Sequence, residues 1–122
     1  MNWDEELVVA AVAALTPVAD GDFRTVGAAI RDLDGAIYTG VNLFHFTGGP
    51  CAEMVALANA GGVQVVRIVA VGDQGRGVVS PCGRCRQVLM DLAPGVEVML
   101  PGGTTSPVEE LLPQGYHWSE GL

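Results

Sequence analysis

Lysine is absent from this chain of 122 residues, and its six basic side chains are all arginines, set against 14 acidic ones. The formal net charge is -8. Proteins that bind DNA or RNA use clustered positive charge to neutralise phosphates, so this balance argues against a polynucleotide partner. A small neutral or cationic partner fits the charge better.

Long apolar runs are also missing. The longest covers residues 7–15, which is too short to span a bilayer. It follows Asp4, Glu5 and Glu6, where a signal peptide would carry positive charge. We therefore expect no membrane segment and a cytoplasmic location, in which thiols stay reduced.

Cysteine is scarce, but its spacing is informative. Cys82 and Cys85 form a Cys-x-x-Cys pair, and Cys51 lies well upstream. Three cysteines cannot all pair within one chain, whereas three thiolates supply three of the four ligands of a tetrahedral Zn²⁺. The fourth position is left for something else, a pattern that favours a catalytic zinc over a structural one.

One domain over residues 1–122 is expected, because 49% of the residues are hydrophobic and can form a core. Strands are predicted over 26–33, 36–41, 64–71 and 96–100, and helices over 3–15, 51–60, 82–92 and 108–112. Asp34-Gly35 predicts a hairpin turn, and segments 43–50 and 72–80 are predicted loops. The order of elements predicts an α/β fold with helices on both faces of a mixed sheet.

The predicted helix over residues 3–15 is apolar almost all round. Such a helix is usually buried on two sides. It either belongs to the core of a monomer or also packs against another subunit, and both interpretations stay open.

Two charged residues stand beside the cysteines. Glu53 lies in the first turn of a predicted helix, where acids are common as caps, but next to zinc-type cysteines it is favoured as a buried proton carrier. Arg84 lies between the paired cysteines and could offset the negative charge of three thiolates, with Arg76 as the alternative. Arg84 could equally be a surface or interface arginine, and Arg86 is expected to be structural.

These motifs resemble a known family. Cys51-Ala52-Glu53 together with Pro81-Cys82-Gly83-Arg84-Cys85 resembles the signature of the zinc nucleoside deaminases, and the cysteine form is similar to the small cytidine deaminases. The runs 26–29, 39–53, 80–89 and 110–116 extend the resemblance over most of the chain. Within the family they are most similar to the branch that deaminates a cytosine nucleoside analogue.

The resemblance implies a cytidine-deaminase-like three-layer sandwich and a homotetramer with one Zn²⁺ per subunit. It implies zinc ligation by Cys51, Cys82 and Cys85, with Arg84 close to the metal. The reaction it implies is hydrolytic removal of the 4-amino group, in which zinc hydroxide attacks C4 while Glu53 shuttles protons.

The chain departs from this pattern in the residues expected to contact the substrate. Cytidine deaminases carry Asn-x-Glu after the second hairpin strand, and the glutamate binds a ribose hydroxyl; here the triplet is Asn42-Leu43-Phe44. Phenylalanine cannot accept that hydrogen bond, which disfavours ordinary ribose recognition. The candidate substrate contacts are Asn42, Phe44, Tyr116 and Trp118. Asn42 could instead cap its loop, and the two C-terminal aromatics could simply pin the terminus.

Arg24 stands where cytidine deaminases tend to place an aromatic residue against the pyrimidine, and Phe23 is one position out of register. Whether Phe23 stacks on a substrate or belongs to the core stays open. His45 has three readings: a fourth zinc ligand, a substrate contact, or a histidine held by its own loop.

Several functions compete. A structural zinc site would need His45 as its fourth ligand, and a thioredoxin-like redox pair would leave Cys51 and Glu53 unexplained. A polynucleotide deaminase conflicts with the charge. The favoured function is deamination of a cytosine nucleoside analogue, with cytidine, deoxycytidine or another aminated heterocycle as the alternative substrate.

Overall fold

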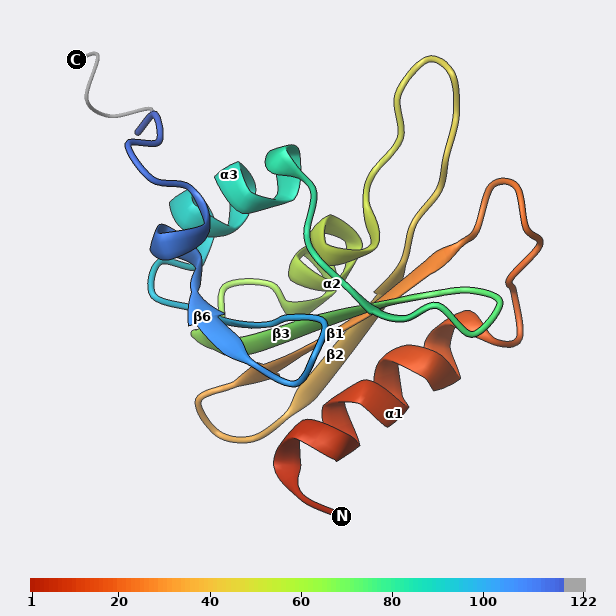
Figure 1. Ribbon diagram of the computed structural model, residues 1–122, viewed down its shortest axis with the longest axis horizontal. Coiled ribbons are helices and arrows are strands. Elements are labelled where there is room, and N and C mark those ends of the chain that lie inside the picture. The colour runs from red at the N-terminus through yellow and green to blue at the C-terminus, as the bar shows by residue number, and fades with distance from the viewer. Residues whose placement is uncertain (118–122) are drawn as a thin grey trace.

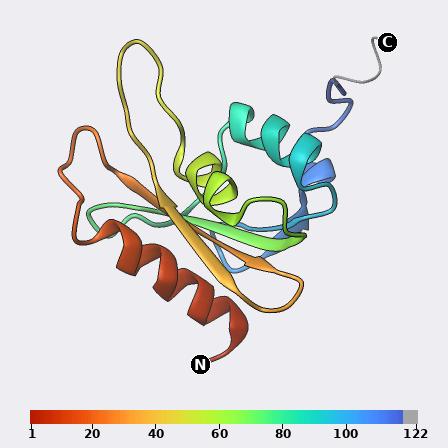
Figure 2. The same ribbon diagram turned by 180° about the vertical axis from the view of Figure 1, so that it is seen from behind.

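The computed structural model describes residues 1–117. A mixed sheet of six strands separates helix α1 (Trp3–Leu15) on one face from α2 (Ala52–Ala60) and α3 (Gly83–Leu92) on the other (Figures 1 and 2). This three-layer arrangement confirms the predicted α/β fold. Within the described residues, no helix combines the length and apolar character that crossing a membrane requires.

The sheet has the order β2-β1-β3-β5-β6, with β4 paired to β3 off this path. Its strands are β1 (Val26–Asp32), β2 (Ile37–Val41), β3 (Val65–Gly72), β4 (Gly77–Val79), β5 (Glu97–Met99) and β6 (Thr105–Pro107). The β1–β2 hairpin closes at the predicted Asp34-Gly35 turn, and β3 with β5 is the parallel pair among these strands. The predicted helices and strands are therefore present, with slightly shifted ends.

Two strands were not predicted. The segment 72–80, predicted as a loop, contains β4, and the Gly/Thr-rich connection before Val108 contains β6. Each has three residues, too few to show the alternation by which strands are recognised. The predicted helix over 108–112 is a single 3-10 turn, η1 (Val108–Leu111), because prolines at 107 and 113 bracket it.

Strand β3 lies in the middle of the sheet, and both of its faces pack against core residues. Ile68 and Ala70 belong to the core beneath α2 and α3, whereas Val69 and Val71 belong to the core beneath α1. Alternate residues of a strand point to opposite faces, so a nearly continuous apolar run suits a strand covered on both sides.

α1 begins at a capping box. The Asn2 side-chain oxygen accepts the backbone N–H of Glu5, and the Glu5 carboxylate accepts the backbone N–H of Asn2. Leu7, Ala11 and Leu15 are buried against the sheet. Val9 and Val12 face outward and are 52% and 45% exposed. One face of this apolar helix thus packs on the sheet, and the opposite face is open in a single chain.

α2 lies unusually close to the sheet. A Cβ atom on Gly40 of β2 would stand 2.4 Å from the Ala56 backbone nitrogen and 2.8 Å from the Ala52 carbonyl oxygen. The helix itself presents small buried residues, Ala52, Ala56 and Ala60, to the core. Glycine below and alanines above therefore set the height of α2, and with it the position of the residue at which the helix starts.

Replacing Gly40 with alanine should force α2 away from β2, because the nearest atoms are helix backbone that cannot rotate aside. We expect Gly40→Ala to lower the free energy of unfolding by about 1–3 kcal/mol, measured by urea denaturation. Gly62→Ala is the matched control, since nothing lies within 4 Å of the Cβ built there. Equal stability of the two variants would contradict the close-contact argument.

Candidate metal centre and active site

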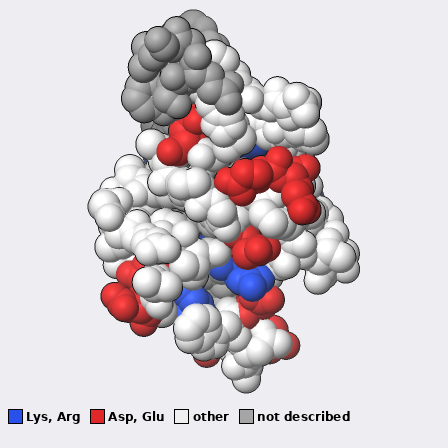
Figure 3. Space-filling view, turned by 90° about the vertical axis from the view of Figure 1, so that its left-hand side faces the viewer, with Lys and Arg blue, Asp and Glu red and all other residues white. Residues whose placement is uncertain are grey.

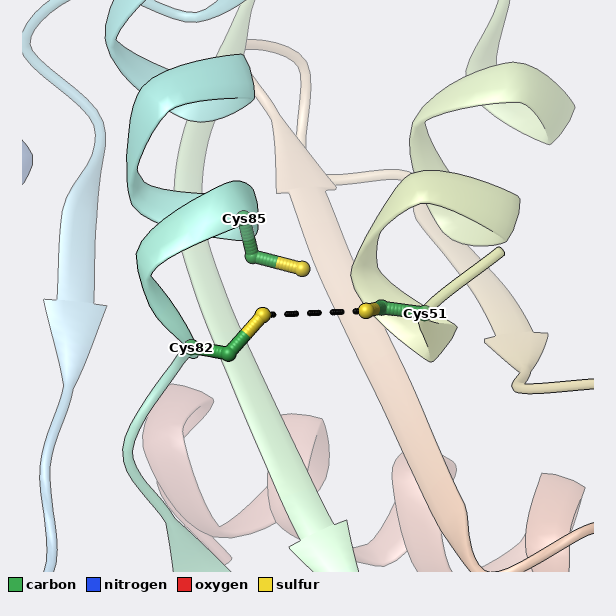
Figure 4. A group of neighbouring side chains, drawn as sticks. All are labelled: Cys51, Cys82 and Cys85. Atoms are coloured by element: carbon green, nitrogen blue, oxygen red, sulfur yellow. Dashed lines mark hydrogen bonds between the residues drawn. The ribbon is translucent and has the colours of Figure 1, made fainter. Parts of the chain in front are cut away.

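The three cysteine sulfurs meet where α2 and α3 begin (Figure 4). Cys51 is the N-cap of α2, Cys82 is the N-cap of α3, and Cys85 lies in the first turn of α3. The sulfurs lie within 4.8 Å of one another, and those of Cys51 and Cys82 are 3.7 Å apart. Tetrahedral Zn²⁺ with Zn–S bonds of about 2.3 Å places its sulfurs roughly 3.8 Å apart, so the donor set and its spacing fit zinc.

Both helices start at a cysteine, and at the start of α3 backbone N–H groups face the cysteine sulfur. Pro50 and Pro81 precede the two cysteine N-caps, and neither cap residue makes a side-chain capping bond. The first N–H groups of a helix have no partner within the helix. Those of Arg84 and Cys85 act electrostatically on the Cys82 sulfur, which places the positive end of α3 against a candidate metal ligand.

The thiols differ in their surroundings. Burial alone would raise the pKa of Cys82, but the backbone N–H of Cys85, the neighbouring thiols and the N–H of Arg84 lower it overall. Burial raises the pKa of Cys85, and the Glu53 carboxylate and the other two sulfurs raise it further. A divalent cation among the sulfurs favours the thiolate at every position and so opposes that rise.

Glu53 lies in the first turn of α2 and is only 6% exposed. Burial raises the pKa of its carboxyl group, against the opposing effect of its own backbone N–H and of the Cys85 thiol. A carboxyl group with a raised pKa can both take up and release a proton near neutral pH. Glu53 lines the same cavity as Cys51 and Cys82.

The three arginines near the cysteine motifs have different contacts. Nη2 of Arg84 donates to the Gly49 carbonyl oxygen and lies 3.6 Å from the Cys51 sulfur. Arg76 donates instead to the Thr25 carbonyl oxygen and to the Asp73 carboxylate. Arg86 donates to the carbonyl oxygens of residues 81 and 111, which ties the residue before Cys82 to the C-terminal segment. The structure therefore places Arg84, and not Arg76, beside a metal ligand.

The cavity has a volume of about 390 Å³, within the range of small-molecule sites. Its lining includes Cys51, Glu53 and Cys82, together with residues of the loop between β2 and α2. Asn42 and Phe44, predicted as substrate contacts, both line it. Two of the candidate metal ligands and the acidic side chain of Glu53 therefore border a cavity that can hold a small molecule.

Asn42 also has the loop-capping role that was its alternative. Its side-chain oxygen accepts the backbone N–H groups of Thr25 and Val26 at 2.8 and 2.9 Å. Its amide nitrogen lies 3.4 Å from the Thr25 hydroxyl. Phe44 is 59% exposed at the cavity wall. The side-chain carbonyl of Asn42 is therefore committed to the fold, although the residue also lines the cavity.

Of the other aromatic candidates in the described part of the chain, Phe23 and Tyr116 are not among the residues that line the cavity. The Tyr116 carbonyl oxygen accepts from the Gln87 side chain on α3, and the Tyr116 side chain is exposed. Trp118 lies outside the described residues. The Phe23 carbonyl oxygen accepts the Phe44 N–H, so Phe23 lies beside the loop, and Arg24 pairs with Asp20.

His45 lines the cavity, but its Nδ1 contacts Thr47 of the same loop, including the Thr47 backbone N–H at 3.1 Å. Among residues 1–117, the metal-ligand cluster that includes the three cysteines contains no histidine. His45 is therefore held by its own loop.

Sequence reasoning missed the role of Gly49. Its carbonyl oxygen is the acceptor for Arg84, and a Cβ atom there would lie 1.9 Å from the Leu43 carbonyl oxygen. The Gly-Gly-Pro run before Cys51 was a usable signal, because consecutive glycines often mark a close backbone approach.

Comparison with known proteins gives the family. Residues 1–99 match the cytidine and deoxycytidylate deaminase zinc-binding region. The chain is 34% identical to blasticidin-S deaminase from Bacillus cereus, over 93% of this chain and 91% of that protein. It is 37% identical to a cytidine deaminase from Halalkalibacterium halodurans, over 70% of this chain and 68% of that one. The crystal structure of cytidine deaminase from Mycobacterium leprae superposes with a TM-score of 0.77 and 36% identity, over 93% and 99% of the two chains.

The chain belongs to the cytidine deaminase family. It is accordingly a zinc-dependent hydrolase that acts on a cyclic amidine and uses one Zn²⁺ per chain, and the cluster of three cysteines fits that cofactor. The resemblance found in the cysteine motifs is confirmed, as are the fold class, the cofactor and the class of enzyme.

Removing the zinc should destabilise the protein, because the ion joins two helices that are distant in sequence. A ligand present at about a hundred times its dissociation constant adds about 2.7 kcal/mol, so we expect chelation to lower the melting temperature by about 10 °C. Cys82→Ala should melt near the temperature of the chelated native chain, and chelator should change the melting temperature of this variant little. An unchanged melting temperature of the native chain after verified zinc removal would contradict this coupling.

Proposed function

We propose that this chain hydrolyses the 4-amino group of a cytosine nucleoside analogue, with blasticidin S as the best candidate substrate. The observation that carries the proposal is Phe44 at the cavity wall, in the position where the family pattern has the ribose-binding glutamate. The similarity to blasticidin-S deaminase, which extends over 93% of the chain, supports it.

Glu53 would be the proton carrier. Zn²⁺ held by Cys51, Cys82 and Cys85 supplies the activation of water that hydrolysis needs. The Glu53 carboxylate would accept a proton from that water and deliver it to the ring nitrogen. It would then accept the proton of the hydroxyl group added to C4 and deliver it to the amino group, which leaves as ammonia. The burial of Glu53 suits this task, because it raises the pKa of the carboxyl group toward the pH at which the proton must be transferred.

The cavity walls would select the substrate. Asn42 would offer its amide N–H to the sugar or base, and Phe44 would give an apolar flank that accepts no hydrogen bond. Tyr116 and Trp118 remain candidate contacts from the C-terminal segment. Arg84 would offset the negative charge of the thiolates from its place beside Cys51.

We also propose that residues 1–122 form a single domain that acts as a homotetramer in the cytoplasm. In support, α1 exposes Val9 and Val12, and a groove along α2 and α3 includes the exposed Val63 and Leu92. Such apolar surface is typical of subunit contacts. Acidic side chains prevail over basic ones on the face in Figure 3, which supports a small-molecule substrate over a nucleic acid.

Cytidine or deoxycytidine is the second candidate substrate. It is favoured by the similarity to several cytidine deaminases, in sequence and in structure, and by Asn42, the part of the Asn-x-Glu triplet that is retained.

A substrate panel on the zinc-loaded protein separates the two candidates. We expect ammonia release and the ultraviolet change of deamination with blasticidin S at a kcat/KM at least about a hundredfold above that for cytidine, because the site offers the ribose hydroxyl no acidic acceptor. Strong turnover of cytidine with none of blasticidin S would reject the first candidate. The matched variant Phe44→Glu should raise kcat/KM for cytidine relative to blasticidin S, and Phe46→Glu, which adds the same charge to the same loop on an 88% exposed residue, should not.

Glu53→Gln tests the proton carrier. The amide keeps the size of the side chain but cannot accept and return a proton, so kcat should fall by at least about a thousandfold. Zinc content, measured by elemental analysis, and the melting temperature should stay near those of the native chain. A variant that keeps its zinc and turns over normally would refute the role of Glu53.

A further inference from the structure

Arg84 spans the gap between α3 and the chain that leads into α2. Its Nη2 atom donates to the Gly49 carbonyl oxygen and lies 3.6 Å from the Cys51 sulfur. The NH₂ group of a guanidinium carries two hydrogens in a fixed plane, so one nitrogen can serve both acceptors. A single side chain of α3 therefore contacts a zinc ligand and the segment just before it.

Gly49 belongs to residues 42–50, which we name the pocket loop and which projects from the body of the molecule (Figures 1 and 2). The base of this loop is tight. The Leu43 N–H donates to the Pro50 carbonyl oxygen at 3.1 Å, and a Cβ atom on Gly49 would lie 1.9 Å from the Leu43 carbonyl oxygen. Whatever fixes Gly49 thus also fixes Leu43, after which come Phe44 and His45 at the cavity wall.

The pocket loop is held from two sides. Toward β1, the Phe44 N–H donates to the Phe23 carbonyl oxygen at 2.9 Å, and Asn42 accepts from the start of the strand. Toward the metal, Arg84 holds the Gly49 carbonyl oxygen. The second attachment comes from α3, which shares a hydrophobic core with α2 and which a bound metal would join to Cys51.

We propose that Arg84 is a positioning residue for the pocket loop, and that zinc occupancy orders this loop through the Arg84–Gly49 contact. The ion ties Cys51 to Cys82 and Cys85 and so keeps the α3 side chain within reach of Gly49. Arg84 also lines the cavity, and in its positioning role it affects substrate binding through the loop. The consequence for substrate binding rests on the proposed function, whereas the coupling of metal to loop does not.

Hydrogen exchange of the loop amides, followed by mass spectrometry, tests this coupling. The native chain, Arg84→Gln and Arg67→Gln are each compared with and without zinc. Arg67 is the matched control because it loses the same charge but pairs with Asp4 on α1, 3.4 Å away. In the native chain and in Arg67→Gln, zinc removal should speed exchange over residues 42–50 by roughly tenfold, the effect of losing one charge-assisted hydrogen bond. Zinc-loaded Arg84→Gln should already exchange near the faster rate, and zinc removal should add little.

The readouts separate a positioning role from loss of metal. Zinc content is measured for each variant, and if Arg84→Gln retains less than one ion per chain, Arg84→Lys replaces it, since lysine keeps the charge but not the planar fork.

With blasticidin S as substrate, zinc-loaded variants should show a rise in KM larger than the fall in kcat. An equal response of the loop to zinc in the Arg84 variants and the native chain would overturn the inference. Absence of turnover with every cytosine nucleoside, with the zinc response of the loop intact, would instead count against the proposed function.

Discussion

The structure depends on holding three sulfurs within 4.8 Å of one another at the starts of two helices. Three thiolates outweigh the charge of Zn²⁺ and leave the centre with a net charge of -1, which works against activating a water. The fold opposes this charge with elements it already has. Backbone N–H groups at the start of α3 face the Cys82 sulfur, and the Arg84 guanidinium faces the Cys51 sulfur. α3 therefore opposes the charge of the metal centre at two points, with the N–H groups of its first turn and with the side chain of Arg84.

Packing brings the two helix starts together. The cysteines can meet only if α2 lies close to the sheet, and its height is set by Gly40 below it and by the alanines of its buried face. Central strand β3 is buried on both faces and keeps α1 away from the side on which the metal lies. A change far from any sulfur, at a glycine of β2, therefore bears directly on the geometry of the metal centre.

The parts of the molecule that follow from local sequence were predictable. Helix 3–15 begins at a capping box and ends before a proline, and its predicted bounds agree with α1. The three cysteines and Glu53 were found because ligand type and spacing carry the chemistry. Strands β4 and β6 were not found, since three residues give no periodicity and their pairing is set by β3 and β5. The contact between Arg84 and Gly49 also escaped prediction, because it joins residues that only the folded chain brings together.

The residues proposed for chemistry and those proposed for specificity lie in different kinds of structure. The cysteines and Glu53 lie at helix starts packed on the sheet, which suits groups that must keep a fixed geometry around a metal. Asn42 and Phe44 lie on the projecting pocket loop. The exposed Phe44 can be replaced without disturbing the core, whereas Asn42 also accepts hydrogen bonds from the start of β1. Specific recognition needs the side chains of this exposed loop to be held in place. In the positioning role proposed for Arg84, its contact with the Gly49 carbonyl oxygen meets that need, because it anchors the base of the pocket loop to the helix that carries Cys82 and Cys85 at its start.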